Sequence, residues 1–176
     1  MKQLKSLSEF RTSFNLKVER IHYRLSYFSR LDIDMDVFLP SKQKNLQRDF
    51  CWTPLQKTEL IKSILLERHI PAISVLNKFN SDFSETYEII DGKQRLSTML
   101  SFLRNEFKIE LEEELFSFDE LPKEYQTAIS CYSIQANIVY EPRVGSITDQ
   151  QKIDWFKHIN FAGTPQDAEF INSLDE

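Results

Sequence analysis

The segment from Tyr87 to Leu103 constrains the fold most strongly, because its apolar residues change their period part-way along. Residues 87–90 are mostly β-branched or aromatic, which is typical of a strand. Beyond Asp91-Gly92 the apolar residues recur every three or four positions, which indicates a helix over residues 93–105. The sequence therefore predicts a strand that passes through Asp-Gly directly into a helix.

The rest of the chain mixes the same two periods. We expect helices over residues 16–31, 54–65, 119–131, 148–160 and 166–173, and strands over 72–79, 107–111 and 132–140. Thr53 is a favourable N-cap, and Pro54 suits the first position of a helix. This order predicts an α+β fold, a small mixed sheet surrounded by helices. Residues 1–34 are expected to form an N-terminal helical appendage, and residues 35–176 the main domain of one structural unit.

Composition excludes several classes of protein. The chain has 176 residues, 41% of them hydrophobic, which is enough for a core. No apolar run approaches the roughly 18 residues that a membrane span needs, so no membrane partner is expected. Cys51 and Cys131 stand alone without a CxxC pair, which argues against a zinc site and favours a reducing compartment. We expect a soluble cytoplasmic protein.

Charge is unevenly distributed along the chain. The net charge of −5 argues against a protein that binds nucleic acid over its whole surface. Residues 1–30 hold seven basic and two acidic side chains, whereas residues 106–124 hold two basic and eight acidic ones. Lys17, Arg20 and Arg24 would share a stripe of the first expected helix, and any DNA contacts are predicted there. The alternative is that both regions are ordinary solvated surfaces.

The Asp91–Arg95 segment is the sharpest candidate site. A helix start offers unpaired N–H groups that favour an anion, and Gly92 allows close approach of a ligand. Lys93 and Arg95 add positive charge in the first turn, where an arginine can grip a phosphate with two hydrogen bonds. Asp91 could cap the helix, hold Mg²⁺ or orient a water molecule. The alternative is that the same residues form a plain tight turn with an Asp cap and two solvated cations.

Two further polar segments allow a functional or a structural interpretation. Gln47, Arg48 and Trp52 lie just before a helix, where they could clamp and stack on a ligand. Trp52 could equally be a core anchor. Near the end of the chain, residues 160–164 could present Asn160, Gly163 and Thr164 to a ligand, or they could form an ordinary helix end and loop.

Together these segments resemble one known family, the N-terminal domain of GmrSD-type restriction proteins, within the ParB-like nucleotide-hydrolase superfamily. The resemblance covers roughly residues 35–172. The matching pieces are Gln47-Arg48-x3-Trp52, Leu60-Ile61-x-Ser63-Ile64-Leu65, Ile70-Pro71, Ile90-Asp91-Gly92-Lys93-Gln94-Arg95-Leu96-Ser97-Thr98 and Phe156-x2-Ile159-Asn160-x2-Gly163-Thr164-Pro165-x3-Glu169.

The resemblance implies a ParB-like α+β fold that binds and hydrolyses a nucleoside triphosphate with Mg²⁺, in a DNA restriction or anti-restriction context. Asp91, Gln94 and Arg95 take the catalytic positions, with Asp91 also the metal ligand. The implied nucleotide-binding residues are Gln47, Arg48, Gly92, Lys93, Thr98, Asn160, Gly163 and Thr164.

Two departures from the family pattern bear on activity. Lys93 stands where the family signature has Gln, which could tighten phosphate binding or weaken turnover. The histidines His22, His69 and His158 are scattered and form no metal motif, so we expect no DNA cleavage by this chain itself. A nuclease or restriction partner would act in trans. The alternative is a non-catalytic module that mimics or inhibits such a partner, or that binds DNA.

Overall fold

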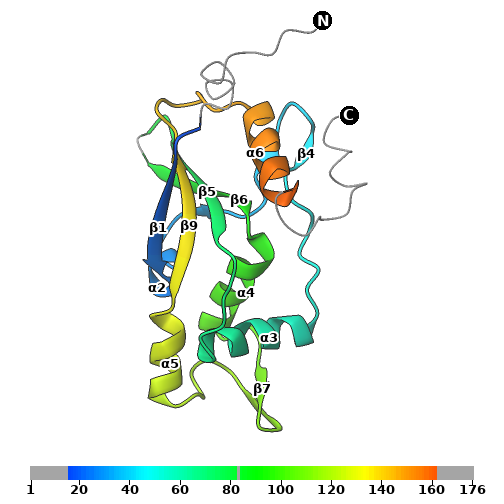
Figure 1. Cartoon of the computed structure of the whole chain (residues 1–176), viewed down its shortest axis with the longest axis vertical. Helices are drawn as coiled ribbons and strands as arrows, with labels where there is room; N and C mark the ends of the chain where they lie inside the picture. Colours follow the sequence, from blue (N-terminus) through cyan, green and yellow to red (C-terminus); the bar gives the residue numbers. More distant parts are fainter. Residues whose placement is uncertain (1–15, 83, 162–176) are drawn as a thin grey trace, which may run out of the picture.

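A mixed five-stranded sheet forms the centre of the protein, in the order β1-β9-β5-β6-β2 (Figure 1). The computed structural model describes residues 16–82 and 84–161. The strands are β1 (Val18–Arg24), β2 (Ile33–Asp34), β5 (Ile73–Phe79), β6 (Glu85–Asp91) and β9 (Ser133–Tyr140). The pairs β1/β9 and β5/β6 are antiparallel, while β5/β9 and β2/β6 are parallel. This arrangement confirms the predicted α+β class.

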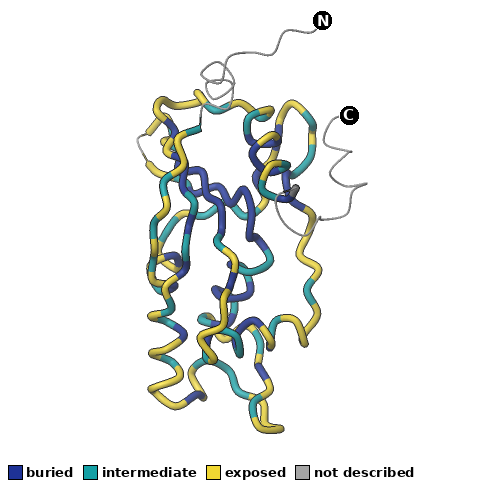
Figure 2. The backbone as a smooth tube through the Cα atoms, viewed as in Figure 1, coloured by how far each residue is buried: buried dark blue, intermediate teal, exposed yellow. Residues whose placement is uncertain are grey.

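Helices and short hairpins cover both faces of the sheet. The helices are α2 (Leu25–Phe28), α3 (Pro54–Leu65), α4 (Lys93–Leu103), α5 (Lys123–Ser130) and α6 (Asp149–Phe161). The hairpins are β3 (Phe38–Leu39) with β4 (Lys44–Asn45), and β7 (Ile109–Leu111) with β8 (Glu114–Phe116). Helices α2 to α5 build the larger core on one face, and α6 with β3 and β4 builds a smaller core on the other. Figure 2 shows the buried chain concentrated in the central strands and α4.

Capping residues and the period of the apolar residues predicted most of these elements correctly. Helix α3 begins with a complete capping box, in which Thr53 Oγ1 accepts from the Gln56 N–H and Gln56 Oε1 accepts from the Thr53 N–H. Such a cap stabilises a helix by about 1 kcal/mol. The predicted strand at residues 107–111 is confirmed as β7, but its partner β8 was not predicted. The helix expected at residues 166–173 lies outside the described residues.

The predicted helix over residues 16–31 is wrong. Residues 18–24 form β1, which pairs with β9 along its whole length, and only α2 is helical. Exposure alternates along β1, so Ile21 and Tyr23 face the larger core while Arg20 and Arg24 face outward. Pairing with a distant strand outweighs the helical spacing of the apolar residues. Of the expected N-terminal helical appendage, residues 18–24 instead belong to the main sheet as β1.

A buried charge cluster joins α6 to the sheet. The carboxylate of Glu88 on β6 lies 2.5 Å from Lys78 Nζ and 2.6 Å from Lys152 Nζ. The Glu88 side chain is 3% exposed and that of Lys152 is 10% exposed. Two ammonium groups on one buried carboxylate keep every charge of the cluster near an opposite one, which is the condition for burying charge at all.

Candidate functional site

Gly92 makes the sharp corner between β6 and α4. Its φ of +102° lies in the left-handed region, which residues with a side chain rarely adopt. A Cβ at this position would lie 2.6 Å from Cγ2 of Ile73, so packing as well as conformation requires glycine. Gly92 itself occupies the N-cap position of α4, without a side-chain cap. Asp91 therefore does not cap the helix, which removes one of the three roles considered for it.

Asp91 and Arg95 form an ion pair one helical turn apart. Asp91 Oδ2 accepts a hydrogen bond from Arg95 Nη2 at 2.9 Å, and the same Nη2 also donates to the carbonyl of Ala72 at 3.1 Å. The side chains are 12% and 21% exposed, so solvent screens the pair weakly. Arg95 Nε is buried and has no partner among the described residues. The pair thus fixes both side chains at the corner.

Lys93 faces a carboxylate that the sequence did not single out. Its ammonium lies 2.5 Å from Asp36 Oδ1, with the lysine side chain 7% exposed and the aspartate 61% exposed. Asp34 holds the loop that carries Asp36, because its Oδ1 accepts from the N–H groups of Asp36 and Val37 at 2.9 Å each. The additional charge that Lys93 brings to the signature is therefore neutralised by a solvent-exposed carboxylate.

Two glutamines tie the segment before α3 to the corner. Gln47 donates from Nε2 to the carbonyl of Ile89 at 2.5 Å and accepts from the N–H of Lys93 at 3.4 Å. Gln94 accepts from the N–H of Cys51 and donates to the carbonyl of Asp49, both at 3.0 Å. Both amide groups are thereby committed to the backbone. The geometry makes Gln94 a positioning residue rather than a group directed at water.

Arg48 and Thr98 lie in opposite environments. Arg48 is exposed, and its guanidinium forms no hydrogen bond or ion pair with the described part of the chain. Thr98 is fully buried, and its hydroxyl donates to the carbonyl of Gln94 inside α4. Trp52 packs against the larger core, which favours its interpretation as a core anchor. Among these residues Arg48 is the one that is available to a ligand.

The smaller core brings the three polar segments of the sequence together. Leu46, Ile90 and Ile159 pack in this one cluster, and each immediately precedes a predicted site residue. Asn160, the residue after Ile159, is buried and donates from Nδ2 to the carbonyl of Phe156 at 2.8 Å. Segments that are far apart in the sequence thus meet at one apolar core.

The remaining predicted residues lie elsewhere or outside the described chain. Gly163 and Thr164 are not among the described residues. Lys17 is exposed and pairs with Glu19 at 2.9 Å, whereas Arg20 and Arg24 project from the outer face of β1. The three cations therefore share no helical stripe, and their contact with DNA stays a prediction.

A magnesium site at the corner needs ligands beyond the protein. No group of three or more His, Cys, Asp or Glu side chains within the described ranges is arranged to hold a metal ion. Asp91 has only its Oδ2 committed to Arg95 by a hydrogen bond. Because Mg²⁺ on a nucleotide is usually held by one or two carboxylates, phosphate oxygens and water, Asp91 fits as such a ligand.

Two hollows of the described surface lie away from this corner. One is lined by residues of α3, α5 and the β7–β8 hairpin, and the other by residues of β1, β9 and the segment after α3. No residue of the Asp91–Arg95 segment lines either one. The corner is thus a largely buried polar segment at a helix start, and it is not part of either hollow.

A match to a protein family shows which family the chain belongs to. Residues 28–174 match the family described as GmrSD restriction endonuclease, N-terminal domain. The chain belongs to this family. No curated protein and no solved structure gave a match. Within residues 16–82 and 84–161, no helix has the length and apolar character required to cross a membrane. Membership of the GmrSD N-terminal family gives the chain a restriction-system context.

Proposed function

We propose that this GmrSD-type domain binds a nucleoside triphosphate at the β6–α4 corner and hydrolyses it. The observation that carries the proposal is the convergence of three polar segments, 46–48, 90–95 and 159–160, on one core next to a helix start. A helix start is a favourable place for phosphate because its first N–H groups lack intrahelical partners. Of these groups, that of Lys93 is taken by Gln47. The N–H groups of Gln94 and Arg95 are the ones proposed to meet phosphate oxygens.

Charge supports the same placement of the phosphates. Arg48 is exposed and unpaired within the described chain, so it can bind phosphate without breaking an existing ion pair. Lys93 can exchange Asp36 for a phosphate oxygen, since the Asp36 side chain is 61% exposed and can turn into water. Arg95 stays with Asp91 and keeps the corner rigid. Phosphate binding would thus use Arg48, which is unpaired within the described chain, and Lys93, which would exchange Asp36 for a phosphate oxygen.

Hydrolysis in this proposal rests on positioning and charge stabilisation, as in other phosphoryl transfers. Mg²⁺, when bound with the nucleotide, would supply charge neutralisation at the phosphates, with Asp91 as its protein ligand. Gln94 would act through the 49–51 segment by holding Arg48 near the helix start. Asp91 Oδ1, which forms none of the hydrogen bonds of the described chain, would be the oxygen that holds Mg²⁺ or orients a water molecule. In the restriction system, a partner in trans would supply any DNA cleavage.

A second candidate, a binding module without turnover, has its own supporting observation. Both amides of Gln47 and Gln94 are committed to backbone groups, and Lys93 is neutralised by Asp36. Such a site can hold a nucleotide and still lack a group free to activate water. Its function would then be to mimic, inhibit or regulate a restriction partner, or to bind DNA.

Calorimetry and phosphate release, measured on the same samples, separate the two candidates. For wild type we expect binding of a nucleoside triphosphate with Mg²⁺, followed by release of phosphate. Arg48→Ala should weaken binding about tenfold to hundredfold, the range for one hydrogen bond to a charged group. Arg104→Ala is the control, because Arg104 lies at the other end of α4 and is exposed. Its affinity should equal that of wild type.

Asp91→Asn tests turnover separately. The amide oxygen can still accept from Arg95, so the corner is retained while the negative charge is lost. Binding with no phosphate release in wild type would favour the binding module. Absence of nucleotide binding, or equal loss in the Arg48 and Arg104 variants, would contradict the proposed site.

A further inference from the structure

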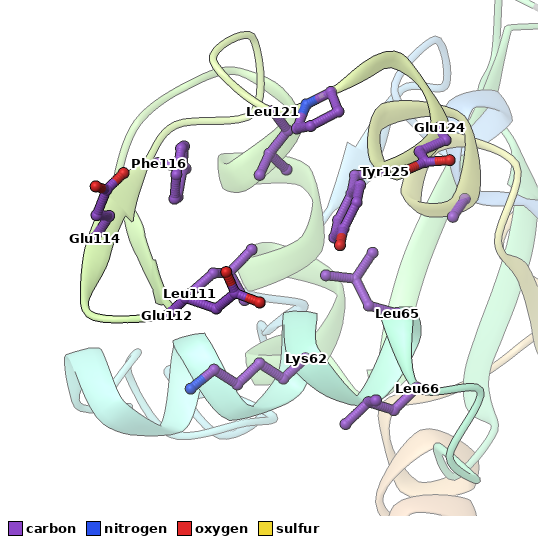
Figure 3. Close-up of a pocket in the computed structure, with 12 residues that line it drawn as sticks. Lys62, Leu65, Leu66, Leu111, Glu112, Glu114, Phe116, Leu121, Glu124 and Tyr125 are labelled. Atoms are coloured by element: carbon purple, nitrogen blue, oxygen red, sulfur yellow. The ribbon is translucent and has the colours of Figure 1, made fainter.

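An apolar groove of about 740 Å³ lies between α3, α5 and the β7–β8 hairpin. Figure 3 shows side chains from all three elements facing this hollow. Its apolar lining includes Leu65, Leu111, Phe116, Leu121 and Tyr125. Leu121 belongs to the buried core, so the floor of the groove is continuous with the folded interior. The volume is within the range of about 300–1,000 Å³ that is usual for ligand sites.

Large apolar side chains remain exposed around the groove. Of the lining residues, Leu66 is 58% exposed and Tyr125 is 37% exposed. Single exposed apolar residues are ordinary, but a contiguous apolar hollow with such neighbours marks an interaction surface. The shape, a trough between two helices and a hairpin, suits an elongated segment of polypeptide.

The rim of the groove is acidic. Glu112, Glu114 and Glu124 line it, and Lys62 is the one basic residue among its lining side chains. Lys62 lies 3.6 Å from Glu59, which reduces its value as a partner for the rim carboxylates. None of the three rim glutamates has an ion pair with another described residue. These exposed carboxylates give the rim a negative charge, which a cationic ligand would neutralise.

We propose that this groove docks a basic amphipathic helix of another polypeptide chain. Apolar residues on one face of the helix would fill the trough, and lysines or arginines flanking them would meet Glu112, Glu114 and Glu124. The same charges oppose DNA or a free nucleotide at this surface. The site is independent of the proposed nucleotide site, since no residue of the Asp91–Arg95 segment lines the groove. Figure 1 places α5 and β7 at the far end of the molecule from α6.

Charge reversal tests the electrostatic half of this proposal. The probe is a fluorescent synthetic helix of leucine and lysine, and binding to the full chain is followed by anisotropy. The triple variant Glu112→Lys, Glu114→Lys and Glu124→Lys should weaken binding about tenfold to hundredfold, as expected for three exposed ion pairs. The matched control is Glu19→Lys, Asp82→Lys and Asp154→Lys, which changes the net charge equally at exposed or partly exposed positions outside the groove. The control should bind the probe like wild type.

A pair of leucine substitutions tests the apolar half. Leu66→Ser removes an exposed leucine of the groove, whereas Leu55→Ser removes one that is 70% exposed on α3 outside it. The first should weaken binding several-fold and the second should leave it unchanged. Circular dichroism spectra show that each variant is folded.

Three results would overturn the proposal. The first is equal weakening by the groove and control variants, and the second is equal affinity for a helix of leucine and glutamate. The third is self-association of the chain that is lost in the triple groove variant, because the occupant would then be a second copy. Binding that depends on the groove charges and on Leu66 would support it.

Discussion

Charged side chains are paired at the β6–α4 corner, whereas those along the groove at the far end are mostly unpaired. At the corner, Lys93 and Arg95 have their own carboxylates, and the backbone conformation is fixed by a glycine that packing requires. Along the β7–β8 hairpin, glutamates stand exposed without ion pairs among the described residues. Buried paired charges shape the fold, so changes there should alter stability first. Exposed unpaired charges can change with little effect on the fold, and the effect should appear in binding.

Gly92→Ala should give the largest loss of stability. The left-handed conformation disfavours alanine by about 1–2 kcal/mol, and overpacking against Ile73 adds about 1–3 kcal/mol. We expect the free energy of unfolding in urea to fall by about 2–5 kcal/mol. Gly145→Ala is a matched control, because Gly145 has φ +69° but no atom within 4 Å of the added Cβ. Equal losses in both variants would show that packing at the corner is not tight.

Glu88→Gln should come next. It leaves the buried Lys152 and the partly exposed Lys78 without the carboxylate that their ammonium groups share. Removing one partner of a buried ion pair can cost about 3–5 kcal/mol, and because water reaches Lys78, whose side chain is 32% exposed, we expect a loss of about 2–3 kcal/mol. Glu59→Gln, which removes an exposed partner of Lys62, should change it by less than about 0.5 kcal/mol. Urea denaturation measures both, and a loss below 1 kcal/mol for Glu88→Gln would contradict the cluster's structural role.

A substitution in the turn of the β7–β8 hairpin should raise the stability of the protein instead of lowering it. Glu113 has φ +69° at the exposed turn between β7 and β8, where glycine is favoured. Glu113→Gly should raise the free energy of unfolding by about 0.5–1 kcal/mol, because relief of backbone strain exceeds the added flexibility of the unfolded chain. Glu114→Gly, in the extended conformation of β8, should lower it. The same sign for both variants would contradict the role assigned to the turn.

The smallest expected effect is the contribution of Glu120 to the pH dependence of folding stability. The N–H of Ser117, at 2.7 Å, and then Lys108, at 2.9 Å, lower the pKa of Glu120 to about 2. Since the folded pKa is depressed, the stability from this carboxylate is present above pH 4.5 and is lost as the pH falls toward 2. Carboxyl NMR titration measures it directly. A midpoint near 4.5 would show that these contacts are not formed in solution.

Elements with strong local signals could be predicted from the sequence. Thr53 and Pro54 marked the start of α3, and the change of period at Asp91-Gly92 marked the junction of β6 and α4. The first strand was mistaken for a helix because its apolar spacing fits both periods. Its partner, residues 133–140, is more than 100 residues away. Pairing of this kind is decided by the whole sheet and not by the local sequence.

Within the site, too, contacts between residues close in the sequence could be predicted, and contacts between distant segments could not. Asp91 and Arg95 are four residues apart, so their meeting on one helical turn follows from spacing. The pairing of Lys93 with Asp36 and the bonds of Gln94 to residues 49 and 51 join segments that only the fold brings together. For this reason the sequence could not predict that Gln94, expected to orient water, bonds to residues 49 and 51. The neighbouring core residues Leu46, Ile90 and Ile159 explain the convergence that the sequence motifs predicted.

An NMR titration with a nucleoside triphosphate and Mg²⁺ shows which residues of the chain meet the nucleotide. We expect the amide signals of Gln94 and Arg95 to shift most and the side-chain signals of Arg48 to follow, while the signals of Glu112 and Glu113 stay unchanged. Shifts that are centred on the β7–β8 hairpin, or no shifts at millimolar nucleotide, would contradict a nucleotide site at the β6–α4 corner.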